Sequence, residues 1–173
     1  MILQLLKQAT RARHAALESR LTLLDPGLSR EDYRLCIGGF FGYYAPLEAH
    51  VLDSPGLREI GLTYSERRKT PRLIDDLKAL GATPDFLARA PLCRELPDVA
   101  SSARLFGCLY VIEGATLGGQ VITRHLHTHL GLTPACGASF FSGYGAQTGS
   151  RWKAFGALLN AYAEQSGQVQ IGR

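Results

Sequence analysis

A chain of 173 residues, of which 46% are hydrophobic, is long enough for one compact domain with a substantial core. Its 19 Lys and Arg against 15 Asp and Glu give a net charge of +4, which suits an anionic ligand or an acidic partner but is too small to indicate nucleic acid. The four cysteines form no C-x-x-C pair, as expected for reduced thiols. We therefore expect a single cytoplasmic domain over residues 1–173.

No segment is predicted to cross a membrane or to direct secretion. The central apolar run from Leu105 to Ile112 is interrupted by Glu113 and is far shorter than the roughly 20 residues that span a bilayer. The N-terminal stretch MILQLLKQATRARH has neither a basic leader nor a small-residue cleavage site. The expected partners therefore include neither a membrane nor nucleic acid.

The first two helices are predicted from apolar residues at helical spacing. One runs from Ile2 to about Leu24, where an Asp-Pro-Gly sequence ends it. The next begins after Ser29, which forms an approximate capping box with Asp32, and ends before the loop at residues 53–56. Its internal Gly38, Gly39, Gly42 and Pro46 predict close packing or a bend.

The second half of the chain continues the helical pattern. Thr70 is expected to cap a helix with proline in its first turn, which Gly81 closes, and TPDFLARA adds a short helix. A long helix is expected from Ser101 or Ser102 to His129, followed by Gly131, and a last one from Thr148 or Ser150 to Glu164. No alternating pattern predicts a strand, so the fold class is all-α.

The predicted long helix contains the stretch LYVIEGATLGGQVITRHL, residues 109–126, with glycine at Gly114, Gly118 and Gly119. Each glycine costs about 1 kcal/mol against alanine in a helix interior. Because glycine has no side chain, the three create a flat strip against which something flat can lie. Close crossing of another helix at Gly114-x-x-x-Gly118 is the alternative explanation.

The first predicted helix carries His14, with Lys7 two turns before it and Glu18 one turn after it on nearly the same face. His14 can bind a metal through one ring nitrogen while Glu18 accepts a hydrogen bond from the other and fixes the tautomer. Lys7 can meet an anion at the edge of the ligand. An ordinary helix-surface pair explains the same spacing.

Together, ATRARHAALE near the N-terminus, YVIEGATLGGQVI a hundred residues later, and SGYGAQTGSRWKAFG resemble the haem oxygenases. The resemblance covers most of the chain and is strongest to the bacterial forms that supply biliverdin to phytochromes. It implies a helical bundle that holds haem between the first helix and a glycine-rich distal helix. Haem is then both cofactor and substrate, and oxygen-dependent cleavage gives biliverdin, CO and Fe²⁺.

The resemblance also implies roles for single residues. His14 corresponds to the iron ligand, and the three glycines to the distal helix. Lys7 and Tyr110 correspond to positions that contact the haem propionates, and Arg151 and Lys153 are further candidates for the same edge. Since the chain has no flavin or nicotinamide motif, electrons are expected from a ferredoxin or a reductase, and a bacteriophytochrome is an expected recipient of the product.

The chain departs from the family at two points. Many relatives carry Asp after the first distal glycine, where this chain has Ala115, and the sequence ends without the family's last C-terminal helix. A non-catalytic haem carrier on the same fold is therefore the alternative function.

Three other patterns suggest different functions. A third hypothesis is a helical regulator that binds DNA or a protein through the basic segment ERRKTPR, residues 66–72, although a solvated loop is the simpler explanation of this segment. His125 and His129 lie one turn apart, as in a metal pair, but a solvated helix end is the simpler explanation. A ferritin-like di-iron site is not favoured because no Glu-x-x-His repeat occurs.

Overall fold

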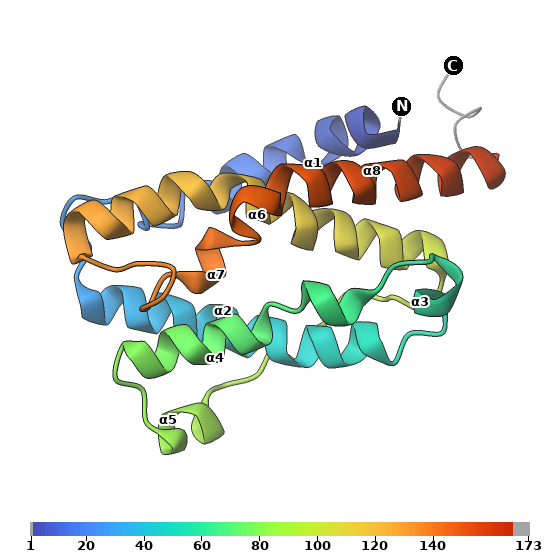
Figure 1. The fold of residues 1–173 in the computed structure, drawn as a ribbon. Helices are drawn as coiled ribbons and strands as arrows, with labels where there is room; N and C mark the ends of the chain where they lie inside the picture. Colours follow the sequence, from blue (N-terminus) through green and yellow to red (C-terminus); the bar gives the residue numbers. More distant parts are fainter. Residues whose placement is uncertain (1, 168–173) are drawn as a thin grey trace.

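The computed structural model describes residues 2–167, and this part of the chain folds into helices with no strand (Figure 1). The all-α prediction is confirmed. The elements are α1 (Ile2–Glu18), α2 (Arg30–Leu52), α3 (Gly56–Glu59), η1 (Tyr64–Arg67), α4 (Thr70–Ala79), α5 (Pro84–Arg89), α6 (Ser102–Leu130), α7 (Ser139–Ser142), η2 (Gly145–Gln147) and α8 (Thr148–Gln165).

The predicted starts and stops of α2 and α6 are confirmed by their capping groups. Ser29 and Asp32 form a reciprocal capping box at the start of α2. The side chain of Ser101 accepts a hydrogen bond from the N–H of Arg104 at the start of α6. Gly131 ends α6 in the left-handed conformation, with φ at 65°.

Two predicted helix ends are wrong. The first helix ends at Glu18 rather than near Leu24, because the chain turns there and buries Leu23 in the core. Thr70 does not cap α4. The N–H groups of Lys69 and Thr70 donate instead to the carboxylate of Glu48 on α2, a residue that the local sequence pattern could not identify as a cap.

The helices form layers around α6 (Figure 1). α2 packs on α4, α7 packs on both α4 and α6, and α8 packs on α6 and on α1. Of the glycines of α2, Gly42 has the predicted role of close packing: a Cβ on it would lie 2.3 Å from the carbonyl oxygen of Pro91, so the segment after α5 crosses α2 at this point. A Cβ on Gly39 would meet no atom within 4 Å, so close packing does not explain this glycine. Phe141 and Phe155 are buried in the core, and Trp152 is half-buried against it.

By length and composition alone, α6 would pass as a membrane-spanning helix, and within residues 2–167 it is the one helix that does so. Buried core helices of soluble proteins pass the same test. One face of α6 is buried against other helices of this fold.

Candidate functional site

The two sides of α6 differ in burial. Residues that recur every three or four positions on one side are buried in the core: Leu105, Leu109, Ile112, Glu113, Thr116, Gly119 and Leu126. On the opposite side, the same spacing gives Val111, Gly114, Gly118 and Val121, which we call the open stripe. The glycine segment thus has a packed side and an open side.

The open stripe is apolar and, apart from the half-buried Gly114, exposed. Val111 is 59% exposed and Val121 is 62% exposed, and Leu117 on the flank of the stripe is 46% exposed. A Cβ on Gly118 would meet no other atom within 4 Å. A contiguous apolar surface of this kind on a folded protein marks a place where a ligand or another surface binds.

Gly119, although predicted to share this strip, is not on the open stripe. A Cβ on it would lie 2.0 Å from the carbonyl oxygen of Phe141, so Gly119 allows α7 to approach the packed side of α6. The alternative explanation, which predicted a close crossing at Gly114 and Gly118, is therefore wrong for Gly118, and the close approach occurs at Gly119 instead. Gly114 is intermediate, since its Cβ would lie 3.7 Å from the ring of Trp152 on α8.

The helix α1 also has one face that is only partly covered. Leu3, Leu6 and Thr10 are half-buried along this face, where α1 packs on α8. The same spacing continues to His14 and Leu17, but Leu17 is 57% exposed and the side chain of His14 is 67% exposed. The second half of α1 therefore presents a histidine and a leucine that no helix of the described structure covers.

Contacts at both ends place this part of α1 beside the open stripe. At one end, Leu3 lies against Gly156 of α8, next to Phe155, which packs on Phe106 of α6. At the other end, the carbonyl of Asp25, which follows α1, lies 3.1 Å from Nε2 of His125 on α6. The two helices consequently run in the same direction, with α8 between them at the first end (Figure 1).

The rise per residue of a helix then gives the position of His14 along α1 relative to Gly118 on α6. Eleven residues separate His14 from Leu3, a rise of about 16 Å, and a similar distance separates Gly118 from the part of α6 that contacts Phe155. His14 and Gly118 thus lie at about the same height on neighbouring helices that do not pack against each other there.

The ring of His14 is oriented as the sequence predicts. Its Nδ1 lies 3.3 Å from a carboxylate oxygen of Glu18, one turn later, and both side chains are exposed. No hydrogen bond from residues 2–167 reaches its Nε2. A carboxylate at Nδ1 favours the tautomer that leaves Nε2 with a free lone pair, which is the form that binds a metal.

Polar and aromatic groups flank this region. Lys7 lies two turns before His14 and is exposed on α1 beside Gln4, Gln8 and Arg11. On α6, Tyr110 lies one turn before Gly114, with its ring 5.8 Å from that of Trp152. Lys7, His14 and Glu18 therefore share one helix, and Tyr110 borders the open stripe.

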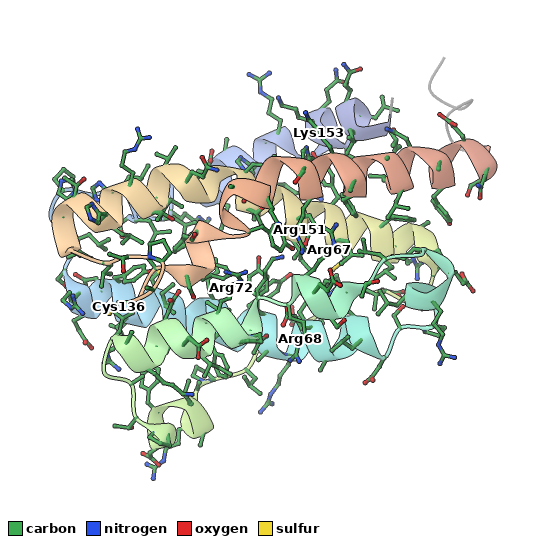
Figure 2. The ribbon with its side chains drawn as sticks, viewed as in Figure 1. Arg67, Arg68, Arg72, Cys136, Arg151 and Lys153 are labelled. Atoms are coloured by element: carbon green, nitrogen blue, oxygen red, sulfur yellow. The ribbon has the colours of Figure 1, made fainter. Side chains whose placement is uncertain are left out.

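The structure does not bring Arg151 to this region. Its guanidinium lies 4.8 Å from the centre of the Tyr144 ring and 3.7 Å from a carboxylate oxygen of Glu66. Figure 2 shows Arg151 beside Arg67, whereas Lys153 points towards the α1 side of α8. Arg151 is therefore engaged with Tyr144 and Glu66, whereas Lys153 is exposed on α8.

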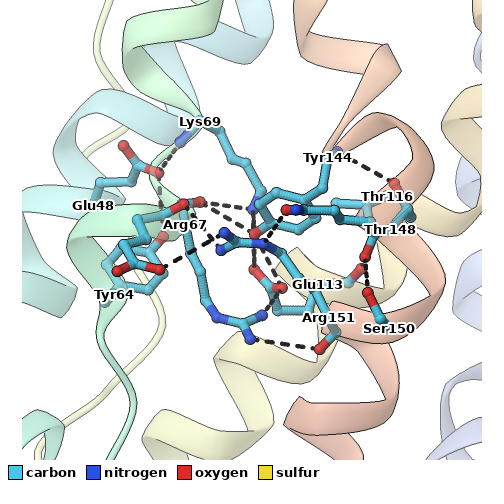
Figure 3. A network of polar contacts seen from close by, with 12 residues as sticks. Glu48, Tyr64, Arg67, Lys69, Glu113, Thr116, Tyr144, Thr148, Ser150 and Arg151 are labelled. Atoms are coloured by element: carbon cyan, nitrogen blue, oxygen red, sulfur yellow. Dashed lines mark hydrogen bonds and ion pairs between the residues drawn. The ribbon is translucent and has the colours of Figure 1, made fainter.

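A buried ion cluster lies on the packed side of α6 (Figure 3). The carboxylate of Glu113, 1% exposed, pairs with Arg67 and with Lys69 Nζ at 3.0 Å, and accepts a hydrogen bond from Tyr144 Oη at 2.8 Å. Burial lowers the pKa of Lys69, while the neighbouring Glu113 carboxylate acts in the opposite direction. Sequence reasoning missed this cluster.

The cluster corrects the prediction for the basic segment 66–72. Arg67 and Lys69 are buried, so this segment is neither a solvated loop nor a continuous basic docking surface; Arg68 is exposed and Arg72 is half-buried. One signal in the sequence could have revealed the buried ion cluster. Glu48 and Glu113 lie on the apolar faces of predicted long helices, where a buried carboxylate requires cations beside it.

The other predicted metal patterns gain no support. The rings of His125 and His129 stack 4.0 Å apart at the end of α6. No group of three His, Cys, Asp or Glu among the described residues is placed to hold a metal ion. Glu48 and Glu113 are engaged in ion pairs and hydrogen bonds, and not in a di-iron arrangement.

Comparison with known proteins identifies relatives. The family model described as "Heme oxygenase" matches residues 1–170. A protein of Xanthomonas campestris pv. campestris (strain 8004) named "Heme oxygenase" is 43% identical over 67 residues, which are 39% of this chain and 36% of that protein. The match thus spans about a third of the length of this relative. No solved structure matches the chain.

Proposed function

Because this chain belongs to the haem oxygenase family, we propose that it cleaves haem with oxygen to give biliverdin, CO and Fe²⁺, using electrons from an external donor. What supports this proposal is that His14 on α1 and Gly118 in the open stripe of α6 come at about the same height when the helix rise is counted from the contacts of Leu3 and Phe106. Two exposed apolar surfaces with the imidazole nitrogen of His14 suit a flat apolar ligand that contains iron.

The residues present fit haem. A Cβ on Gly118 would occupy open space, so glycine leaves room there for a ring system. The flanking Val111, Val121 and Leu17 supply apolar contacts, and burying them against a ligand would be worth about 25 cal/mol per Å². Lys7, on the same face of α1 as His14, would pair with a propionate.

Haem supplies, when bound, the iron that activates oxygen and the ring that is cleaved. His14 would hold the iron through Nε2, and Glu18 would keep the proton on Nδ1. The α6 side of the proposed site carries no titratable group, since its residues are Val111, Gly114, Ala115, Gly118 and Val121. Hydrogen bonds on this side would therefore come from water and backbone N–H groups. Such a surface lacks the acid–base side chain that would favour peroxidase-like chemistry.

We further propose a ferredoxin or a reductase as the electron donor, a bacteriophytochrome as a recipient of biliverdin, and the cytoplasm as the location. The absence of flavin and nicotinamide motifs from the sequence supports an external donor. The four free cysteines support a reducing compartment.

The test is a haemin titration of the purified protein, followed by addition of an electron donor in air and chromatography of the products. We expect a Soret band of histidine-ligated haem that decays to biliverdin. In His14→Ala, we expect turnover to fall to background with the fold intact. An unchanged rate with a wild-type haem spectrum in this variant would exclude His14 as the ligand.

The alternative function, a haem carrier, rests on Ala115, where a carboxylate would otherwise organise water on the α6 side. A stable haem complex that yields no bilin with a competent donor would support the carrier. No binding of haemin at all would exclude both functions.

A further inference from the structure

The buried ion cluster joins α6 at one residue, Glu113, which directly precedes Gly114. The groups that bind the Glu113 carboxylate come from separate parts of the chain: Arg67 at the end of η1, Lys69 before α4 and Tyr144 before η2. Arg67 also donates to the carbonyl of Arg151 on α8 at 3.5 Å. The cluster thus ties the beginning of the glycine segment to the rest of the molecule (Figure 3).

The glycine segment needs such support because its own helical propensity is low. Three glycines within residues 114–119 weaken the helix and make bending there easier. On the packed side, Glu113 is held by its ion pairs, Thr116 donates to the carbonyl of Glu113 at 2.6 Å, and Gly119 lies against Phe141. The segment is therefore positioned by contacts on the packed side and not by its own sequence.

We propose that Glu113 is a positioning residue. Its ion pairs with Arg67 and Lys69 fix the glycine segment along and around the axis of α6, and so fix the position of Gly118 relative to His14. This inference rests on the proposed function. Glu113 does not touch the ligand in this scheme, because five residues place Gly118 about 140° away from it around the helix.

The test compares Glu113→Gln with Glu48→Gln. Both carboxylates are fully buried and belong to the same polar network. The partners of Glu48 are Tyr64, Arg68, Lys69 and Thr70, none of them on α6. A merely structural role predicts similar effects of the two changes, whereas positioning predicts effects on α6 from Glu113→Gln alone.

The first readout is hydrogen exchange of the protein without haem. In Glu113→Gln, we expect the amides of residues 114–119 to exchange about tenfold faster or more, because the segment has lost its anchor. In Glu48→Gln, we expect faster exchange at the start of α4 and wild-type exchange at residues 114–119. Equal exchange at residues 114–119 in both variants would overturn the proposal.

The second readout is the haemin complex, in which the midpoint of the acid–alkaline transition of the ferric form reports the environment beside α6. We expect Glu113→Gln to move this midpoint by more than about 0.5 pH unit and Glu48→Gln to leave it unchanged. The same shift in both variants would overturn the proposal. If Glu113→Gln does not fold, Arg67→Lys, which keeps the charge but shortens the reach, should show a smaller change at the same amides.

The two proposals fail in different ways. If the wild-type protein does not bind haemin, the proposed function fails, while the exchange experiment still decides whether Glu113 positions the segment. If haemin binds and the exchange of residues 114–119 is insensitive to Glu113→Gln, the positioning role fails and the proposed function stands.

Discussion

The two sides of α6 share one stretch of helix but meet opposite surroundings. On the packed side, Glu113 has a buried guanidinium, ammonium and phenol as partners, and Gly119 touches the backbone of α7. On the open stripe, Val111, Gly118 and Val121 are exposed, and no other helix within residues 2–167 covers them. The packed side of this helix therefore stabilises the fold, while the open stripe contributes little to stability and is accessible to a ligand.

The largest expected effect on the packed side comes from removing a buried cation. Arg67→Met leaves the Glu113 carboxylate without its guanidinium, and loss of one partner from a buried pair costs about 3–5 kcal/mol in the free energy of unfolding. Chemical denaturation measures it. The control is Arg89→Met, which breaks an exposed pair with Asp85 and should cost less than about 1 kcal/mol. Similar losses in both variants would show that burial of the cluster contributes little.

The comparison is sharpest at two adjacent glycines. Gly119→Ala forces the added Cβ against the carbonyl of Phe141 and should destabilise the fold by about 1–3 kcal/mol. Gly118→Ala meets no atom within 4 Å and should instead stabilise the helix by about 0.5–1 kcal/mol. Denaturation midpoints of the two variants give the answer. Effects of the same sign would contradict the assignment of the two sides.

A larger side chain on the open stripe should affect the ligand and not the fold. Gly118→Leu is expected to weaken haemin binding tenfold or more and to abolish biliverdin formation without destabilising the fold, because leucine, like alanine, favours the helix more than glycine does. Titration and product analysis measure both. Gln120→Leu, exposed elsewhere on the same helix, is the matched control and should bind haemin normally. Normal biliverdin yield from Gly118→Leu would place the ligand elsewhere.

The smallest expected effect is a pH dependence of the packed side. Burial raises the pKa of Asp76 above its ordinary value of 3.8, although this carboxylate accepts hydrogen bonds from the N–H groups of Ser139 and Phe140 at the start of α7. At pH values between the ordinary and the raised pKa, this carboxyl group is protonated more often in the folded protein than in the unfolded chain. The contribution of Asp76 to stability should therefore fall as the pH rises through this window.

Unfolding measured against pH checks this expectation. Asp76→Asn does not titrate, so the difference in slope between the wild-type protein and this variant reports the contribution of Asp76. A difference of the opposite sign would mean that the N–H donors outweigh burial at this carboxylate.

Part of the candidate site could be read from the sequence because it depends on spacing along one helix. His14 and Glu18 are four residues apart, which is sufficient to bring an imidazole beside a carboxylate. Lys7 shares their face for the same reason. Arg151 shows the limit of this reasoning: the sequence places it on α8, but its partners Tyr144 and Glu66 determine which way it points.

The sequence by itself determined the all-α class, the capped ends of α2 and α6, and the glycine segment, because these follow from periodicity and capping within short stretches. The tertiary structure alone decided that Gly118 is open while Gly119 is packed, and that Arg67 and Lys69 are buried. The physical reason is distance along the chain. The cations that pair with the buried carboxylate of Glu113 lie more than forty residues away in the chain. A pattern within one short stretch of sequence cannot indicate such a pairing.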